Sequence, residues 1–393
     1  AQYYKDRGVT TIAGGQHFAA ENIDEALDNG IDYLLLGEAE ETIVELLRAL
    51  EQDQPVDYIK GLAYRKEDRT VVTEKRPKIH DFKKLPLPNF SLVRYARIKL
   101  YPVERIRGCG MNCEFCTVKG RPRPAPAERL FNQITDLVET AQAKRFFVVD
   151  DLFGQHREET LRFCDMIADY QEKMGISLKL SVQIRLDKAK DTELLAAMRK
   201  AGIRTVCIGF ESPIEEELQA MHKNIRSETM VSLARTFHKF GFFVHGMFIF
   251  GYPLVQKPEI QISLDERVKR YRDFIKKARI DTVQILLTVP LPGTQLRQRL
   301  LAQDRVYPVS EVGWQYYDGT FPVFEPDSPL TATQMQLAAK RIMGSFYHLR
   351  NVFMVPLNIL SFAQLVFFLH NLNRGWQRWY RSWRNHLLRF GGW

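Results

Sequence analysis

The stretch Glu104-Arg105-Ile106-Arg107-Gly108-Cys109-Gly110-Met111-Asn112-Cys113-Glu114-Phe115-Cys116 decides how the rest of the sequence is interpreted. It places three cysteines at C-x3-C-x2-C spacing in a predicted loop that follows a short β-like run. Thiolates bind iron–sulfur clusters, and a cube of four irons usually takes four of them. Three clustered thiolates leave one iron open to a small chelating molecule. The spacing therefore favours a 4Fe–4S cluster on Cys109, Cys113 and Cys116 that does chemistry as well as storing an electron.

Two simpler interpretations stay open at this point: a zinc site, or three unrelated thiols. Structural zinc usually takes four protein ligands, and no fourth Cys or His lies near the motif in the sequence. The two remaining cysteines, Cys164 and Cys207, lie in a helix-like and a strand-like run, which is typical of buried core thiols. A disulfide framework is therefore not expected, and we expect a reducing cytoplasmic location.

The cysteine motif, with an aromatic residue just before its last Cys, resembles that of the radical S-adenosylmethionine (SAM) enzymes. In that family the open iron chelates SAM, and an electron from the cluster cleaves SAM, usually to a 5′-deoxyadenosyl radical. The resemblance covers roughly residues 95–300. The phrases Gly209-Phe210-Glu211-Ser212 and Pro290-Leu291-Pro292-Gly293-Thr294 resemble the branch that carries a cobalamin-binding domain before the barrel, the class B methyltransferases.

The first 60 residues alternate short apolar strands with helices, as in a doubly wound parallel sheet. They resemble the second half of a cobalamin-binding domain, and Gly14 and Gly15 match the Gly-Gly motif that lies against the corrin in that domain. The sequence begins with Ala and apparently inside a domain, so we expect a further N-terminal segment with the earlier motifs of the domain. Without that segment, cobalamin binding by these residues is expected to be weak.

The expected domains are a partial cobalamin-binding-like domain at 1–60, a linker at 61–95, a radical SAM core at 96–300 and a helical C-terminal extension at 301–393. The fold class is α/β, with a partial (β/α)6 barrel in the core. Six apolar runs that alternate with amphipathic helices are its predicted strands: Val103–Arg107, Phe146–Val149, Leu178–Ile184, Thr205–Ile208, Phe243–Ile249 and Thr282–Leu287.

Polar residues follow several of these strands, at the barrel edge where such folds place their sites. By resemblance, Asp150 or Asp151 binds the SAM amino group, and Arg185 suits the SAM carboxylate because guanidinium binds it as a fork. Gln183 and Glu211 are expected at the ribose hydroxyls, and Phe115 is expected near the adenine. For each residue alone, a helix cap or a surface ion pair is the simpler alternative; Asp151 and Glu211 both precede predicted helices.

The net charge of +9 is a property of the C-terminal part of the chain. Residues 328–393 contain eight Lys and Arg and no Asp or Glu. Within them Val352–Leu369 is strongly apolar, and a helix packed on the barrel, an interfacial membrane helix and a membrane span all remain open. The tail that follows interleaves Trp with Arg, which suits a membrane surface, a nucleic acid or the protein itself. We expect membrane-surface contact, and do not expect nucleic acid, as its partner.

The resemblance implies a radical SAM enzyme that carries out cobalamin-dependent methylation of an unactivated carbon, with a 4Fe–4S cluster, SAM and cobalamin as cofactors. A small-molecule or lipid-like substrate and an external electron donor such as flavodoxin or ferredoxin would be its partners. Two alternatives stay open: a cobalamin-independent radical cyclisation or rearrangement, and a non-catalytic scaffold that only binds the cluster.

Overall fold

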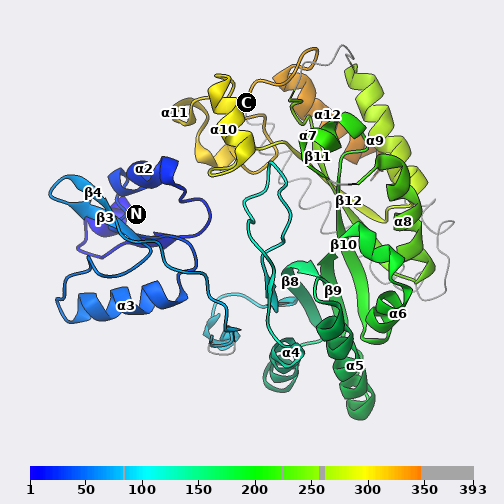
Figure 1. Cartoon of the computed structure of the whole chain (residues 1–393), viewed down its shortest axis with the longest axis horizontal. Helices are drawn as coiled ribbons and strands as arrows, with labels where there is room; N and C mark the ends of the chain where they lie inside the picture. Colours follow the sequence, from blue (N-terminus) through cyan, green and yellow to red (C-terminus); the bar gives the residue numbers. More distant parts are fainter. Residues whose placement is uncertain (83–84, 224, 256–261, 347–393) are drawn as a thin grey trace.

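A six-stranded parallel sheet carries the central part of the chain (Figure 1). The computed structural model describes residues 1–346 apart from 83–84, 224 and 256–261. The strand order is β12-β11-β10-β9-β8-β5, and β5 and β12 form the two ends of an open sheet, as the predicted partial barrel requires. The strands are β5 (Tyr101–Val103), β8 (Arg145–Phe153), β9 (Lys179–Ile184), β10 (Ile203–Glu211), β11 (Phe243–Phe250) and β12 (Thr282–Leu287).

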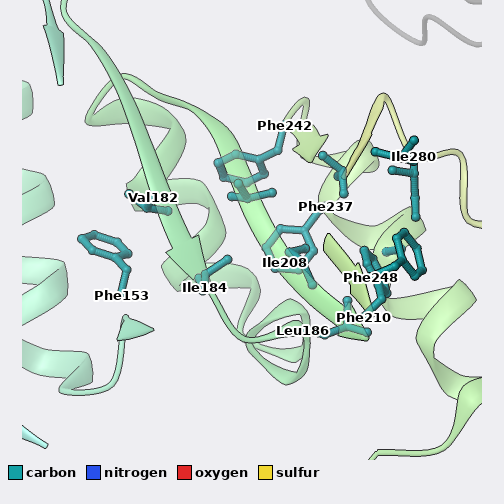
Figure 2. Close-up of a cluster of buried hydrophobic side chains, with 14 of the residues drawn as sticks. Phe153, Val182, Ile184, Leu186, Ile208, Phe210, Phe237, Phe242, Phe248 and Ile280 are labelled. Carbon is teal, nitrogen blue, oxygen red and sulfur yellow. The ribbon is translucent and has the colours of Figure 1, made fainter. Parts of the chain in front are cut away.

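Amphipathic helices connect these strands and cover one face of the sheet. They are α4 (Ala127–Ala141), α5 (Arg157–Met174), α6 (Thr192–Lys200), α7 (Glu215–Ala220), α8 (Ser227–Lys239) and α9 (Leu264–Ala278). Alternate strand residues such as Val182, Ile208 and Phe248 are buried against them (Figure 2). Because the helices cover this face along the whole sheet, the core is continuous from one end of the sheet to the other.

The first predicted strand is interrupted in the structure. Only Tyr101–Val103 pairs with the barrel sheet, and Ile106–Arg107 forms a separate strand, β6, antiparallel to β7 (Arg123–Pro124). The chain leaves the sheet because the Asp150 carboxylate accepts hydrogen bonds from the backbone N–H groups of Arg105 and Ile106. The cysteine loop therefore connects the two strands of the β6–β7 ribbon and does not follow a barrel strand directly.

The N-terminal module, residues 12–72, is a second sheet of order β1-β2-β3-β4. The parallel strands β1 (Ile12–Gly14) and β2 (Tyr33–Leu35) continue into the antiparallel hairpin of β3 (Leu62–Lys66) and β4 (Arg69–Val72). The sheet thus runs across the boundary expected at residue 60.

Helices lie on both faces of this sheet. On β2, Leu35 packs with Leu46 of α3 (Glu40–Glu51), whereas its neighbour Leu34 packs with Ile23 and Leu27 of α2 (Ile23–Asp28). Successive strand residues point to opposite faces, so two adjacent leucines serve two different layers. This is the doubly wound arrangement that the sequence predicts.

After the barrel the chain forms α10 (Gln295–Ala302), α11 (Val309–Val312), a 3-10 turn at Trp314–Tyr316 and α12 (Ala332–Phe346). Helix α12 packs against β12 and α9 through the buried residues Met335, Ala338 and Ile342. The apolar run Val352–Leu369 and the basic aromatic tail lie outside the described residues. Within the described part of the chain, no helix has the length and apolar character needed to cross a bilayer.

Candidate functional site

A cavity of about 750 Å³ opens at the carboxyl ends of the barrel strands. It is lined by the cysteine loop and by residues that follow β8, β9 and β10. The predicted site residues among its lining are Cys109, Cys113, Phe115, Cys116, Asp151, Gln183, Arg185 and Glu211. The fold therefore brings together side chains that are up to 102 positions apart in the sequence. Asp150, Gly14 and Gly15 do not belong to this lining.

The three thiols of the motif influence one another electrostatically. Burial raises the pKa of Cys113, where nearby Lys223 acts in the opposite direction and Cys116 and Cys109 raise the pKa further. Burial also raises the pKa of Cys116, and Cys109 adds to the rise. Thiolates held so near one another need a cationic partner, which the irons of a cluster provide. The donor set therefore fits a cluster with three protein ligands.

No three His, Cys, Asp or Glu side chains of the described residues form a group that could hold a single metal ion. A single ion needs every ligand within about 2.0–2.3 Å. A cube of four irons instead distributes its thiolates over different irons.

Adjacent aspartates of β8 hold the entrance to the cysteine loop. One Asp150 oxygen accepts the N–H groups of Arg105 and Ile106 at 2.6 and 2.9 Å, and Asp151 accepts the N–H of Gly108 at 2.6 Å. The pairing of β8 with β9 shifts register between Val148 and Phe153, so both aspartates lie where the strand pairing is irregular. Asp150 is buried beneath the loop, and Asp151 borders the cavity.

Gly108 is required where the loop turns. Its φ is +89°, and a Cβ placed there would lie 2.6 Å from the carbonyl oxygen of Arg121. Only glycine adopts this conformation and also lets the two limbs of the loop approach so closely.

A buried ion pair anchors the middle of the loop. Glu114, between two of the cysteines, accepts Nε and Nη2 of Arg299 at 2.6 and 2.9 Å, and the hydroxyl of Tyr252 donates to it at 2.6 Å. Glu114 is 4% exposed, so this fork-shaped contact is sheltered from water. Its position fixes the flanking Cys113 and Cys116 relative to α10.

Lys119 closes the loop from its outer limb. Its ammonium donates to the carbonyl oxygen of Cys113 at 2.8 Å, and its own carbonyl accepts from Lys78 at 2.9 Å. The backbone N–H of Gly110 also donates to the carbonyl of Gly120 at 2.9 Å. These bonds hold the two limbs of the loop together beyond the short β6–β7 ribbon at its base.

Arg185 extends from the end of β9 toward the loop. Its Nη1 lies 3.0 Å from the sulfur of Met111, and its Nε donates to Asp187 at 2.9 Å. The guanidinium lines the cavity, where it can bind an anionic group. Gln183, two residues earlier in the chain, donates a long hydrogen bond of 3.4 Å to the carbonyl oxygen of Asp151.

Glu211 ends β10 in a left-handed backbone conformation with φ of +62°. Lys223 donates to its carboxylate at 2.6 Å inside the cavity lining. Burial lowers the pKa of Lys223, but Glu211 together with Cys113 and Cys109 outweighs this effect and the net pKa is raised, so the ammonium stays charged. A Cβ at Gly209 would lie 2.3 Å from a Glu211 oxygen, so glycine makes room for the carboxylate.

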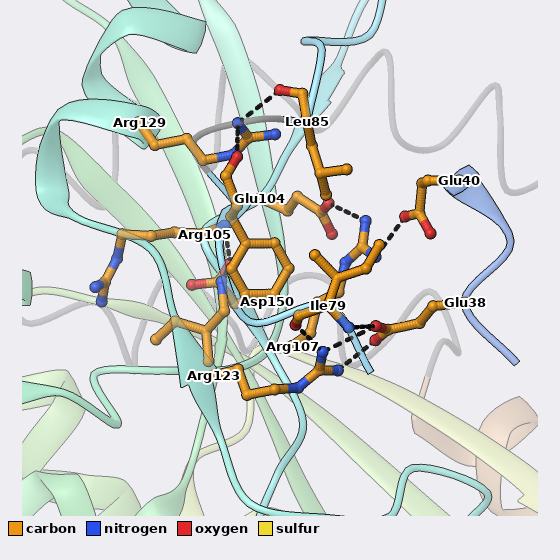
Figure 3. A network of polar contacts seen from close by, with 12 residues as sticks. Glu38, Glu40, Ile79, Leu85, Glu104, Arg105, Arg107, Arg123, Arg129 and Asp150 are labelled. Atoms are coloured by element: carbon orange, nitrogen blue, oxygen red, sulfur yellow. Dashed lines mark hydrogen bonds and ion pairs between the residues drawn. The ribbon is translucent and has the colours of Figure 1, made fainter. Parts of the chain in front are cut away.

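The N-terminal module forms ion pairs with both strands of the β6–β7 ribbon (Figure 3). Glu38 forms an ion pair with Arg123 and accepts the N–H of Ile79 at 2.7 Å. Glu40 pairs with Arg107, which also donates to Glu104 at 2.8 Å. The residues that flank the cysteine loop are therefore fixed by the other module.

Sequence reasoning missed these supporting residues. Glu114 lies inside the cysteine motif, and a lone acid between two cysteines was the available signal. The partners Arg299, Lys223, Glu38 and Arg123 carry no spacing signal, because each meets the loop only through the tertiary fold.

Comparison with known proteins adds a family to this geometry. Residues 103–266 match the radical SAM superfamily. An uncharacterised methyltransferase of Pyrococcus horikoshii is 27% identical over 326 residues, which is 81% of this chain and 67% of that protein. The hopanoid C-2 methylase of Rhodopseudomonas palustris is 27% identical over 282 residues, 70% of this chain and 50% of that enzyme. The chain thus spans half to two thirds of the length of these relatives.

Among solved structures, the radical SAM methyltransferase TsrM of Kitasatospora setae, with cobalamin and a [4Fe-4S] cluster bound, superposes with a TM-score of 0.60 at 18% identity. The superposition covers 75% of this chain and 60% of TsrM. At this identity the likeness shows the fold: a barrel of this kind preceded by an α/β module.

We predict that Glu114→Gln loosens the cysteine loop. The substitution leaves the half-buried Arg299 without its anionic partner, and breaking such a pair costs about 3–5 kcal/mol. The midpoint of urea denaturation should fall, and iron bound after reconstitution should fall with it. Glu193→Gln, which breaks the exposed pair with Arg157, is the matched control and should leave both unchanged. Equal iron content in the two variants would contradict the assignment.

We also predict a pH effect from Asp150. Burial raises its pKa from 3.8 to about 6, although the two N–H donors act in the opposite direction. The folded protein therefore holds this proton more tightly than the unfolded chain, and stability falls as pH rises from about 4 to about 6. Asp150→Asn should flatten that slope in urea titrations of the cluster-free protein. Val149→Ala removes no titratable group and should keep the wild-type dependence of stability on pH. Identical slopes in the wild type and both variants would refute the prediction.

Proposed function

We propose, on the premise that residues 103–266 belong to the radical SAM superfamily, that this protein is an enzyme that cleaves SAM at a 4Fe–4S cluster and methylates an unactivated carbon with the help of cobalamin. The observation that carries the proposal is that one cavity joins three thiols to cationic and polar side chains from neighbouring strand ends. A site that only stored electrons would need neither the open iron position nor these side chains.

The cluster, when bound on Cys109, Cys113 and Cys116, supplies the electron that cleaves SAM. Arg185, which lines the cavity, would present its guanidinium to the carboxylate of SAM, and Asp151 would offer an anionic partner to the amino group. Glu211 and Gln183, which also line the cavity, would accept hydrogen bonds from the ribose hydroxyls. Lys223 neutralises Glu211, so the lining does not present unbalanced negative charge to the thiolates.

Phe115 also lines the cavity. Its ring meets Tyr252 edge-on with centroids 6.1 Å apart, and the Tyr252 hydroxyl is in turn held by Glu114. This fixes the backbone between the last two cysteines, where an adenine would find peptide N–H and C=O groups. We therefore keep Phe115 as a residue that positions the base.

Two similarities support methyl transfer as the outcome. Both reported relatives are named as methyltransferases, and one acts on a hopanoid, so a lipid-like or other small-molecule substrate is the class we propose. TsrM was solved with cobalamin and a [4Fe-4S] cluster bound, and its fold superposes on 75% of this chain. Gly14, at the end of β1, and Gly15 are the residues proposed to approach the corrin. A low-potential flavodoxin or ferredoxin would serve as reductant.

The test is anaerobic reconstitution with iron and sulfide, followed by incubation with SAM, reductant and hydroxocobalamin. The expected products are 5′-deoxyadenosine and S-adenosylhomocysteine, the second only when cobalamin is present. 5′-Deoxyadenosine alone, independent of cobalamin, would point to a cyclisation or rearrangement. If no SAM-derived product forms, the interpretation that remains is a non-catalytic scaffold. The Cys109/Cys113/Cys116→Ala variant should bind no cluster, whereas Cys164→Ala and Cys207→Ala should bind it normally.

We predict that Arg185→Ala and Asp151→Asn each weaken SAM binding. Truncating one partner of a charged contact in a partly dry site costs about 2–5 kcal/mol, or roughly 30-fold or more in affinity. Lys188→Ala, in the same turn after β9 but outside the cavity lining, is the control and should bind SAM normally. Equilibrium dialysis of the cluster-loaded proteins measures the effect. Wild-type affinity in both variants would exclude these roles.

A further inference from the structure

A ten-residue loop stands out from the barrel between the two modules. We call residues 91–100 the strap loop. Phe90 packs edge-on against Tyr101 of β5 with ring centroids 5.3 Å apart, so the two ends of the loop are pinned together. Phe90 and Tyr101 also contact the barrel core. Nine of the ten residues between them are exposed. In Figure 1 the light-blue turn that begins the loop is seen to the left of helix α4.

The strap loop exposes apolar side chains that an ordinary surface loop would bury or replace. Tyr95 is fully exposed and Leu92 is 70% exposed, and Val93 and Leu100 are also exposed. Leu87, just before the loop, adds another exposed apolar side chain. Single exposed apolar residues are normal, but several in one short loop mark an interaction surface.

The same loop is strongly and uniformly basic. Residues 82–103 contain five Lys and Arg and no Asp or Glu. Arg94, Arg97 and Lys99 of the loop are exposed and have no ion pair within the described part of the chain. The loop thus presents unpaired cations and uncovered apolar side chains side by side. A partner surface that carries negative charge and also admits apolar groups would suit both.

We propose that the strap loop docks the protein onto an anionic membrane surface. Aliphatic side chains and a tyrosine enter the headgroup region, and the arginines and lysine meet lipid phosphates. A second copy of the chain does not suit this surface, because a two-fold contact would bring like charges together. A single-stranded nucleic acid does not suit it either, since only Tyr95 could stack on a base and the other apolar residues are aliphatic.

Docking at this loop would also affect which substrate reaches the site. This part of the inference rests on the proposed function. The loop continues directly into β5, and the chain then enters the β6–β7 ribbon that carries the cysteine loop. A lipid-phase substrate would thus be available from the surface to which the barrel is bound. The strap loop selects substrates by location, while the cavity selects them by shape.

The test is co-flotation of the cluster-loaded 393-residue protein with vesicles. Phosphatidylcholine vesicles are compared with vesicles containing 30% phosphatidylglycerol, at about 50 mM and about 500 mM NaCl. We expect binding to the anionic vesicles that weakens at high salt. Arg94→Gln/Arg97→Gln/Lys99→Gln should partition roughly 100-fold less at low salt, from the loss of three cations near the surface. Leu92→Ser/Tyr95→Ser should also partition less, by roughly tenfold or more.

The matched control is Lys269→Gln/Arg272→Gln/Lys276→Gln on the exposed side of α9, which removes the same charge elsewhere. Its partitioning should stay near that of the wild type. Equal partitioning of the control and strap-loop variants would overturn the proposal and would assign any binding to overall charge or to residues 328–393. A wild-type dimer that Leu92→Ser/Tyr95→Ser dissociates, without any loss of vesicle binding, would overturn it as well.

Formation of 5′-deoxyadenosine in solution separates this inference from the proposed function. The strap-loop variants should cleave SAM at the wild-type rate, because none of these residues touches the cavity. Wild-type protein that binds vesicles but does not cleave SAM would refute the proposed function and leave the docking surface intact. Protein that cleaves SAM but ignores anionic vesicles would refute the docking surface alone.

Discussion

The structure depends on holding in place a cysteine loop that has only the two-stranded β6–β7 ribbon at its base. The loop leaves the barrel at Glu104, and carboxylates take over from the missing ladder bonds: Asp150 and Asp151 bind its entrance, and Glu114 anchors its centre to Arg299. A carboxylate is suited to this task because two oxygens can accept several N–H donors that would otherwise be buried without partners. Three thiols consequently face one cavity in a chain segment with almost no secondary structure of its own.

The two modules are joined at the same loop. Glu38 and Glu40, at the end of β2 and the start of α3, pair with Arg123 and Arg107 on the two strands of the ribbon. These side chains are partly shielded, so their pairing is less screened than that of exposed ions. A displacement of the N-terminal module would pull on both limbs of the cysteine loop together. By linkage, if a ligand of the N-terminal module changes the affinity of the cysteine loop for its own ligand, the ligand of the loop changes the affinity of the module by the same free energy.

Much of this was predictable from local pattern, and the rest was not. The apolar runs predicted as barrel strands and the alternation on β2 required only periodicity, and the cysteine spacing required only the motif. The division of the first strand was not predictable, because it is caused by Asp150, more than 40 residues away. The sequence could not separate Asp150 from Asp151 either, since the irregular strand pairing decides which of two neighbours meets the cavity. Similarly, nothing local marks the β3–β4 hairpin as part of the N-terminal sheet.

The conformation of Glu211 shows how the core supports the site. A left-handed backbone costs a residue with a side chain about 1–2 kcal/mol. The preceding Phe210 is fully buried and stacks on Phe248 with centroids 5.5 Å apart, and burying such a ring contributes about 1.5–3 kcal/mol. The core contact therefore outweighs the backbone cost and fixes the end of β10. Glu211 must then turn the other way, toward Lys223 and the cavity. The polar geometry at this strand end follows from apolar packing one residue earlier, so a change at Phe210 would move a carboxylate that it never touches.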